Sequence, residues 1–362
     1  MKKKALLVTS GALDKTGVPS VIMTVARGLC PEWEFDILLS GREGGYFEPE
    51  FLRLGGRILR YRKKRFRLGP LNTLADFFRP LSLFWHTRRA IRRYGPYDAV
   101  HCHNEFDMAG SLAAARAMKV PARVGHVHKD WSLRGGPVTM LYRALCRRAI
   151  LSCATARLGC SRQACGAFYG PGKGETVYNP YDETRFVPGK AGDRPPHILQ
   201  VGYFCDNKNQ LFTLDVFARL AARLPEARLT LVGAAEGEYG GKVRRAIEDR
   251  GLTDRVTLLP PDADVPALMR ECGLLLFPSR AEGFGMVLIE AQASGLHCVS
   301  SDSVPRETDL GGVTYLPLSL GAQAWAEAIL ADGLWQRARP RSAEAFSTGR
   351  FIQSIHRAYG GS

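Results

Sequence analysis

Residues 277–291 have the sequence FPSRAEGFGMVLIEA, which is the most informative stretch of the chain for predicting the fold. A short apolar strand ends at Phe277, a loop with two glycines follows, and a helix begins near Met286. The N–H groups of such a loop and the positive end of the following helix together favour a phosphate group. Gly283 and Gly285 let a ligand approach the backbone closely, because neither residue has a Cβ atom. The stretch therefore predicts a phosphate-binding strand, loop and helix.

Two carboxylates belong to the same stretch, Glu282 before the helix and Glu290 about two turns inside it. One carboxylate can accept hydrogen bonds from both hydroxyls of a ribose, so we expect Glu290 to face a nucleoside. Glu282 would then face the group beyond the phosphates. The alternative is that Glu282 only complements the helix dipole and that Glu290 lies on the surface. The apolar neighbours of Glu290 favour the ligand-binding interpretation, because an unpaired buried carboxylate is costly.

The same alternation of short apolar runs and longer segments of helical period continues through both halves of the chain. The expected strands are residues 5–8, 35–39, 99–101, 123–127 and 156–159, then 198–202, 229–232, 256–259, 274–277 and 297–300. Strands separated by helices imply a parallel sheet covered on both faces. Residues 187–196 are rich in linker residues. We predict an α/β protein with two doubly wound domains, residues 1–187 and 188–362, that face each other across a cleft.

Positive charge is concentrated in the first half of the 362-residue chain, whose net charge is +15. Residues 1–180 hold 30 Lys and Arg against 13 Asp and Glu, with clusters at Arg53–Arg67 and Arg88–Arg93. Apolar and aromatic residues interleave these clusters, which favours an anionic membrane surface over nucleic acid. The alternative is a solvated basic face. The nine cysteines match no disulfide framework, and no apolar run spans a bilayer, so we expect a cytoplasmic, peripheral membrane protein.

The glutamate pair and the segments that follow it, residues 289–296 (IEAQASGL) and 301–307 (SDSVPRE), resemble glycosyltransferase family 4. They are most similar to its exopolysaccharide and capsule branch. The resemblance covers nearly the whole chain and implies the GT-B fold, with an acceptor-binding first domain and a nucleotide-sugar-binding second domain. It also implies a last helix that can pack back on the first domain. The catalytic residues that it implies are His128, Lys208 and Glu282. The donor-binding residues are Gly17, Gly202, Gly233, Arg280, Gly283, Phe284, Gly285, Met286, Val287 and Glu290.

Three positions depart from the family pattern. Tyr203 stands where an arginine is common, and Arg280 is the cation expected to replace it beside Lys208. Thr16 precedes a single glycine where the family often has two, and Pro260 replaces a usual glycine near the base pocket.

Four histidines follow or end two predicted strands, as the pairs His101/His103 and His126/His128. Neither pair has the spacing of a metal site on a helix, so we predict no metal site here. The resemblance assigns the donor-sugar contact to His128, with His126 as the second choice. His101 and His103 are expected to be structural.

The expected activity is retaining transfer of a sugar from a nucleotide-diphosphate donor to a lipid-linked or glycan acceptor, in exopolysaccharide or capsule biosynthesis. UDP is expected by family frequency alone. No cofactor and no metal are expected, since Lys208, loop amides and the helix end can stabilise the leaving diphosphate. Two alternatives remain open at this stage. One is another nucleotide-sugar enzyme such as an epimerase. The other is a degenerate GT-B protein that uses its basic domain to bind anionic lipid or nucleic acid.

Overall fold

The computed structural model describes residues 2–41, 43–61, 77–129, 136–189, 196–331, 333–337 and 341–360. They form two compact units, Met1–Pro180 with Thr348–Ser362, and Tyr181–Ser347. The predicted boundary at residue 187 thus lies inside the second unit, and the last helix belongs to the first. The physical reason is packing, because Phe351 and Ile355 of that helix are buried in the core of the first unit.

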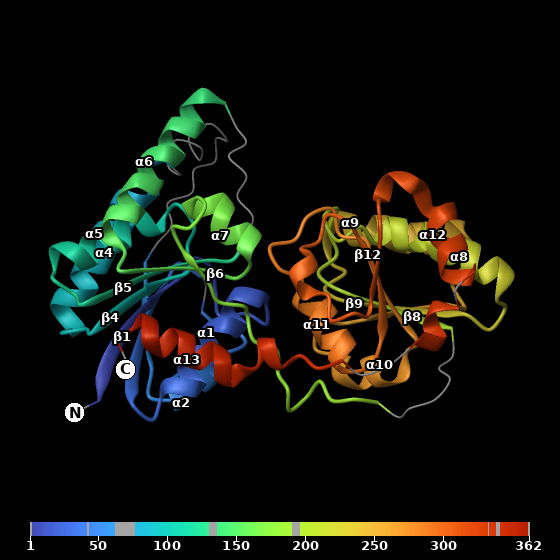
Figure 1. Cartoon of the computed structure of the whole chain (residues 1–362), viewed down its shortest axis with the longest axis horizontal. Coiled ribbons are helices and arrows are strands. Elements are labelled where there is room, and N and C mark those ends of the chain that lie inside the picture. Colours follow the sequence, from blue (N-terminus) through green and yellow to red (C-terminus); the bar gives the residue numbers. More distant parts are fainter. Residues whose placement is uncertain are drawn as a thin grey trace. The chain divides into compact units, whose positions relative to one another are not determined.

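A seven-stranded parallel sheet forms the centre of the first unit, in the order β3-β2-β1-β4-β5-β6-β7 (Figure 1). Its strands are β1 (Lys3–Val8), β2 (Trp33–Leu39), β3 (Arg57–Arg60), β4 (Ala99–Cys102), β5 (Ala122–Val127), β6 (Ala156–Gly159) and β7 (Glu175–Thr176). Its described helices are α1 (Gly17–Leu29), α2 (Glu48–Arg53), α4 (Arg79–Tyr94), α5 (Met108–Ala117), α6 (Pro137–Cys153), α7 (Arg162–Tyr169) and α13 (Thr348–Ala358).

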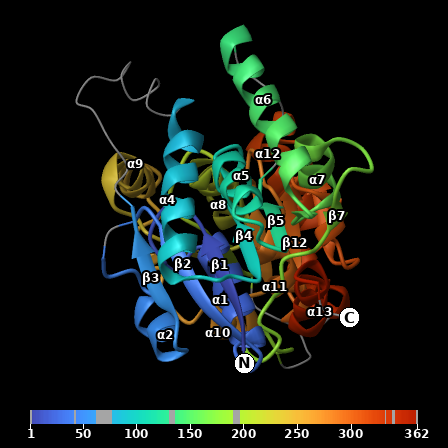
Figure 2. The ribbon, with the colours of Figure 1, turned by 90° about the vertical axis from the view of Figure 1, so that its left-hand side faces the viewer.

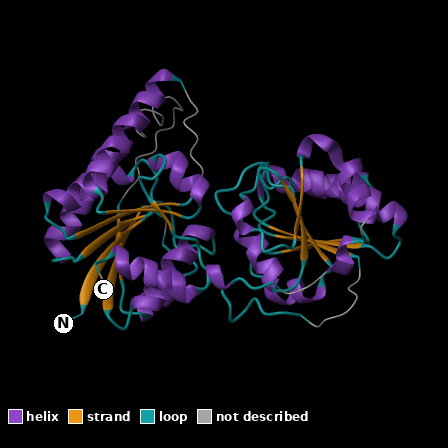
Figure 3. Cartoon of the chain, in the orientation of Figure 1, coloured by secondary structure: helices purple, strands orange, loops and turns teal. Residues whose placement is uncertain are grey.

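Helices cover both faces of this sheet, as the three-layer arrangement in Figure 3 shows. Side chains of α1, α2 and α13 form a core on one face, and those of α4, α5, α6 and α7 form a core on the other. In the central strand β1, Ala5 to Val8 are all fully buried. This continuous apolar run is typical of a strand that contacts helices on both sides.

The second unit repeats this plan with a six-stranded sheet, in the order β10-β9-β8-β11-β12-β13. Its strands are β8 (His197–Val201), β9 (Arg228–Val232), β10 (Val256–Leu259), β11 (Leu274–Phe277), β12 (His297–Ser301) and β13 (Val313–Leu316). Its α-helices are α8 (Gln210–Arg223), α9 (Gly237–Asp249), α10 (Val265–Glu271), α11 (Met286–Ala293) and α12 (Gly321–Ala331). Short 3-10 helices lie at Arg306–Thr308, Leu318–Leu320, Leu334–Arg337 and Glu344–Phe346. One core gathers α8, α9 and α12, and the other gathers α10 and α11.

The expected α/β class and the expected strands are confirmed in both units, but three strands were missed, β3, β7 and β13. Strand β3 lies inside the stretch that we interpreted as a basic surface cluster. Two of its arginines have acidic partners: Arg60 Nη2 lies 2.6 Å from Glu48 Oε2, and Arg57 Nη1 lies 3.8 Å from Asp36 Oδ2. These two ion pairs therefore link the edge strand β3 to α2 and to β2. Residues 62–67 of the predicted cluster lie outside the described residues.

Candidate active site

Two loops meet at the carboxyl edge of the second sheet, because β8 and β11 are neighbouring parallel strands. Hydrogen bonds join the loop after β8 to the loop after β11. Arg280 N donates to Asn207 O (2.8 Å), and Asn207 Nδ2 donates to Ala281 O (2.9 Å). Asn209 Nδ2 also donates to Pro278 O (3.3 Å). The sequence analysis missed both asparagines, since nothing near them in the chain shows that the two loops touch.

Lys208 and Glu282, predicted as catalytic from positions far apart in the chain, form an ion pair. Lys208 Nζ lies 2.5 Å from Glu282 Oε1, and the two side chains are only 21% and 14% exposed. The same ammonium lies 4.9 Å from the centre of the Phe277 ring. Gln200 Nε2 donates to Lys208 O (2.7 Å), which fixes the backbone that carries this lysine. The pair therefore holds a cation and a carboxylate together at the strand ends.

The glycine loop leads directly into α11, as the sequence predicted. Gly285 is the residue before the helix and has φ +94°, a conformation that glycine adopts without strain. Met286 and Val287 begin the helix and are half-buried. The Phe284 side chain is only 3% exposed and packs 5.7 Å from the Phe346 ring. Because this side chain is part of the core, residue 284 can offer a ligand little beyond its backbone.

Glu290 is half-buried on α11, and its carboxylate has no hydrogen bond or ion pair with the described residues. Burial raises the pKa of Glu290 to about 7, Arg185 opposes this shift, and Asp182 adds to it. The carboxylate is thus held near apolar groups without a protein donor. That is the state expected of a group whose partners arrive with a ligand. Arg185 and Asp182 are neighbours that the sequence did not reveal.

The remaining second-unit residues lie around the same strand ends. Arg280 is half-exposed, and its Nε donates to Asp206 O (3.2 Å). Its guanidinium therefore reaches the loop after β8, whereas the Tyr203 side chain is 63% exposed. Gly202 and Gly233 end β8 and β9. A Cβ at Gly233 would lie 2.1 Å from Gly202 O, so this close approach of backbones requires glycine.

The sequence contains one Asp-x-Asp triplet, Asp262-Ala263-Asp264, which the prediction of metal independence did not consider. Asp264 is the residue before α10, and its Oδ1 accepts a hydrogen bond from Ala267 N (3.1 Å). Both aspartates are exposed. The second carboxylate therefore caps a helix, which is a frequent role for aspartate at this position.

The predicted residues of the first unit lie directly after β5 and at the start of α1. His128, one residue beyond β5, is 8% exposed, and burial lowers its pKa to about 4, while Asn179 opposes the shift. Its Nε2 lies 2.9 Å from His103 Nδ1. Gly17 begins α1 in an exposed position, and Thr16 before it makes no side-chain cap. The structure assigns these two residues to the first unit, and all other predicted site residues to the second.

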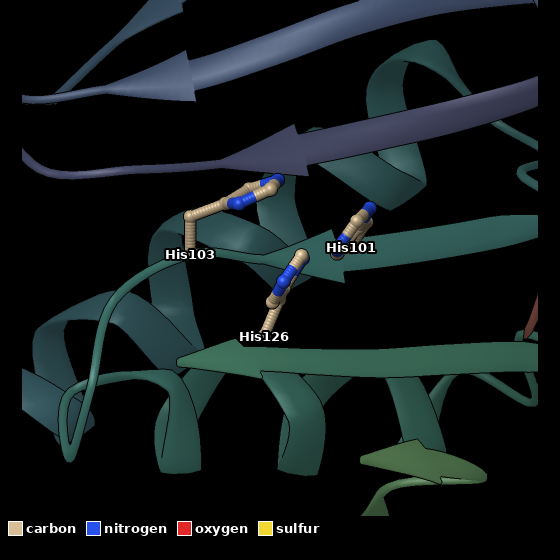
Figure 4. Close-up of side chains that lie close together, drawn as sticks. All are labelled: His101, His103 and His126. Carbon is tan, nitrogen blue, oxygen red and sulfur yellow. The ribbon is translucent and has the colours of Figure 1, made fainter. Parts of the chain in front are cut away.

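Three histidines that we expected to be unconnected with a metal lie close together in the first unit. One ring nitrogen from each of His101, His103 and His126 lies within 4.8 Å of the other two (Figure 4). We predicted no metal site because the spacing is not helical. That criterion was unsuitable, because these residues lie on or directly after strands, where every second residue shares a face.

Comparison with known proteins identifies the class. Residues 16–178 match the family model described as "Glycosyl transferase 4-like domain", and residues 195–331 match "Glycosyl transferases group 1". EpsF of Bacillus subtilis (strain 168), assigned by name as a glycosyltransferase, is 32% identical over 348 residues, 91% of this chain and 87% of that protein.

Solved structures agree on the fold. Anabaena Alr3699/HepE, crystallised in complex with UDP and glucose, superposes with a TM-score of 0.76. It is 17% identical, over 99% of this chain and 100% of that one. A glycosyltransferase from Rickettsia africae ESF-5 gives a TM-score of 0.75 at 17% identity, over 99% of this chain and 98% of that one. The two units therefore form a glycosyltransferase of the GT-B type. Within that class, the chain belongs to glycosyltransferase family 4.

Proposed function

We propose that this glycosyltransferase transfers a sugar, with retention of configuration, from a nucleotide-diphosphate donor to a lipid-linked or glycan acceptor in exopolysaccharide or capsule assembly. The observation that carries the donor assignment is the unpaired carboxylate of Glu290, half-buried on the helix that follows the glycine loop. A ribose diol would supply the two donors that this carboxylate lacks. UDP is the first nucleotide to test, because the Anabaena protein of the same fold is crystallised with UDP and glucose.

The proposed roles of the site residues follow from the charge that develops during sugar transfer. The departing diphosphate gains negative charge, which Lys208 and the amides of the Gly283–Gly285 loop would stabilise without a divalent metal at the phosphates. Glu282, paired with Lys208, would contact the donor sugar. His128 is neutral near pH 7 because burial lowers its pKa, so it would contribute a hydrogen bond to the sugar and carry no charge. Retention follows the family and is part of the proposal.

Calorimetric titration of the purified protein with UDP, GDP and ADP, without added metal, tests the donor site. We expect one nucleotide to bind saturably, and Glu290→Gln to weaken that binding. The matched control is Glu248→Gln, an exposed carboxylate on α9. If none of the three nucleotides binds, or if both variants bind like the wild type, Glu290 is not a donor-binding residue.

Two helices of the first unit support the proposed membrane association. Helices α4 and α6 both contact α5 and lie along one side of the unit (Figure 2). Each begins with a stripe of large apolar side chains at positions i, i+3 and i+7, all between 55% and 71% exposed. They are Phe78, directly before α4, with Leu81 and Trp85 on that helix, and Val138, Leu141 and Leu145 on α6. Such spacing puts the three side chains of each helix on one face.

Basic residues follow these apolar stripes. Arg89, Arg92 and Arg93 are exposed on α4, and Arg148 is exposed on α6. Apolar side chains combined with arginines suit the interface of an anionic membrane. None of the described helices is both long and apolar enough to cross a bilayer. We therefore propose peripheral docking through α4 and α6, at the cytoplasmic face, where a lipid-linked acceptor would be presented.

Flotation with vesicles of neutral and of anionic lipid tests this docking. The wild type should float with anionic vesicles. Leu141→Glu should lower the partition coefficient for these vesicles about 10- to 100-fold, which corresponds to the transfer free energy of one leucine side chain. Leu320→Glu is the matched control, because Leu320 is 52% exposed in the second unit. Equal loss in both variants, or no binding of the wild type, would refute docking through α6 and would leave the donor site unaffected.

A further inference from the structure

Four buried histidines share one face of the first sheet. His101 lies on β4, His103 directly after it, His126 on β5 and His128 directly after β5. The two strands are parallel neighbours, with His101 opposite Val124 and Cys102 opposite Gly125. One further step along this register places His103 beside His126. Since alternate residues of a strand point to the same face, the period of two gathers all four rings on one side of the sheet.

The rings of this cluster contact one another inside the protein. The centroids of His101 and His103 are 4.1 Å apart, and those of His126 and His128 are 4.3 Å apart. The exposed fraction of each side chain is 8% or less. Burial lowers the pKa of all four imidazoles, and for His101, His103 and His126 it lowers the pKa well below the usual value. The four rings therefore face one another in a part of the unit that is closed to solvent.

The hydrogen bonds of the cluster leave a specific set of nitrogen atoms unused. His101 Nδ1 lies 3.0 Å from the Tyr359 hydroxyl, and His103 Nδ1 lies 2.9 Å from His128 Nε2. Among the described residues, neither Nε2 of His101 and His103 nor either ring nitrogen of His126 has a partner. Buried polar atoms are nearly always paired, so four unpaired nitrogens on His101, His103 and His126 need an explanation.

A metal ion explains this pattern. Histidine ligands usually bind a metal through one ring nitrogen and donate the other ring N–H to an outer partner, which orients the ring. Tyr359 and His128 have the positions of such outer partners for His101 and His103. Zinc lies about 2.0–2.1 Å from each ligand nitrogen, which puts nitrogens of one tetrahedral site roughly 3.4 Å apart. One nitrogen of each ring now lies within 4.8 Å of the other two, so binding would draw the three rings closer together.

We propose that His101, His103 and His126 bind one Zn²⁺ ion, with the fourth position open to water. Neutral imidazoles are ligands that suit zinc, and three of them leave a position open. The site goes beyond the proposed glycosyl transfer and does not depend on it. The zinc site would be linked to the proposed sugar-binding residue His128. When His103 binds the metal, its Nδ1–H donates a hydrogen bond to His128 Nε2. Zinc would thereby fix the tautomer and the orientation of His128.

The test is metal binding by the untagged, full-length protein after removal of metals with a chelator. Titration with Co²⁺ should give visible ligand-field absorption that saturates at one equivalent, and Zn²⁺ should abolish it. His126→Asn should remove the signal. Tyr359→Phe should weaken binding about 10- to 100-fold, because it removes only the outer partner of His101. His197→Asn, on β8 of the second unit, is the control and should bind like the wild type.

Each outcome decides the proposal. A wild type that shows no saturable Co²⁺ absorption overturns it, and so does a signal that survives in His126→Asn. If His126→Asn does not fold, Tyr359→Phe still decides, since a purely structural Tyr359 would leave the metal affinity unchanged. UDP binding is measured on the same preparations. A wild type that binds UDP but no metal refutes only the zinc site, whereas a wild type that binds metal but no UDP refutes only the donor site.

Discussion

Glu290→Gln should stabilise the unliganded protein while it weakens donor binding. The structure holds the Glu290 carboxyl with a pKa of about 7, against an ordinary value of 4.5, and burial is the first cause. At roughly 1.4 kcal/mol for each tenfold change in the proton equilibrium, keeping this group ionised in the fold costs at most about 3.5 kcal/mol. Glutamine has nearly the same shape and no charge, so it removes that cost.

The pH dependence of this stabilisation has a definite sign. The folded pKa of Glu290 lies above the unfolded value, so the folded protein binds the proton more tightly between pH 4.5 and about 7. The stability of the wild type relative to Glu290→Gln therefore falls as the pH rises through this window, and the penalty is complete above pH 7. At pH 4.5 the two proteins should be nearly equally stable. At pH 8 the variant should be the more stable one.

Differential scanning calorimetry at pH 5 and pH 8 measures the stability, and titration with UDP measures the function. For a unit of this size, 1 kcal/mol shifts Tm by about 2–4 °C, so the variant should unfold several degrees higher at pH 8. Each lost charge-assisted hydrogen bond costs about 1.5–3 kcal/mol, so UDP should bind at least about 10-fold more weakly. A variant less stable than the wild type at pH 8, or one with unchanged UDP affinity, would refute the reasoning about Glu290.

Three further results are expected. Lys208→Gln should weaken UDP binding about 10- to 100-fold and leave uridine binding unchanged, because only the diphosphate needs the cation. Calorimetric titration with both ligands measures this, and equal losses of affinity for the two would contradict the phosphate role. Gly233→Ala should lower stability by about 1–3 kcal/mol, because its Cβ would lie 2.1 Å from Gly202 O, whereas Gly17→Ala meets nothing within 4 Å and should leave Tm unchanged. Ser161→Ala should cost about 1 kcal/mol in chemical denaturation, because it removes the bond from Ala164 N that caps α7; an unchanged midpoint would exclude that role.

Local patterns were sufficient to predict most of the fold. The strand at Leu274–Phe277 and the helix at Met286–Ala293 carry their own signals, an apolar run and a glycine-containing start. The edge strand β3 does not, because Arg57 and Arg60 flank only two apolar residues in a stretch that resembles a basic surface. Their partners, Asp36 and Glu48, are distant in sequence, so only the folded sheet explains these arginines. The first unit ends at Pro180, before the linker-like residues 187–196 that suggested the boundary, whereas the last helix completes the first core, as the resemblance implied.

The candidate site shows the same division between local and distant information. The order Gly283, Gly285, Glu290 could be interpreted from the sequence because a single strand, loop and helix contain the whole motif. The Lys208–Glu282 ion pair required knowledge that β8 and β11 are neighbours, although five helices and strands separate them in the chain.

The histidine cluster needed both kinds of information at once. The period of two within each pair already places His101 with His103, and His126 with His128, on one face of its strand. What no single segment contains is that β4 and β5 are adjacent and parallel, and that their faces coincide. A search for helical metal spacing fails on strands for this reason, whereas two H-x-H pairs at the ends of adjacent parallel strands necessarily bring imidazoles together. The hydroxyl of Tyr359, beyond the end of α13, then orients one of them from the far end of the chain.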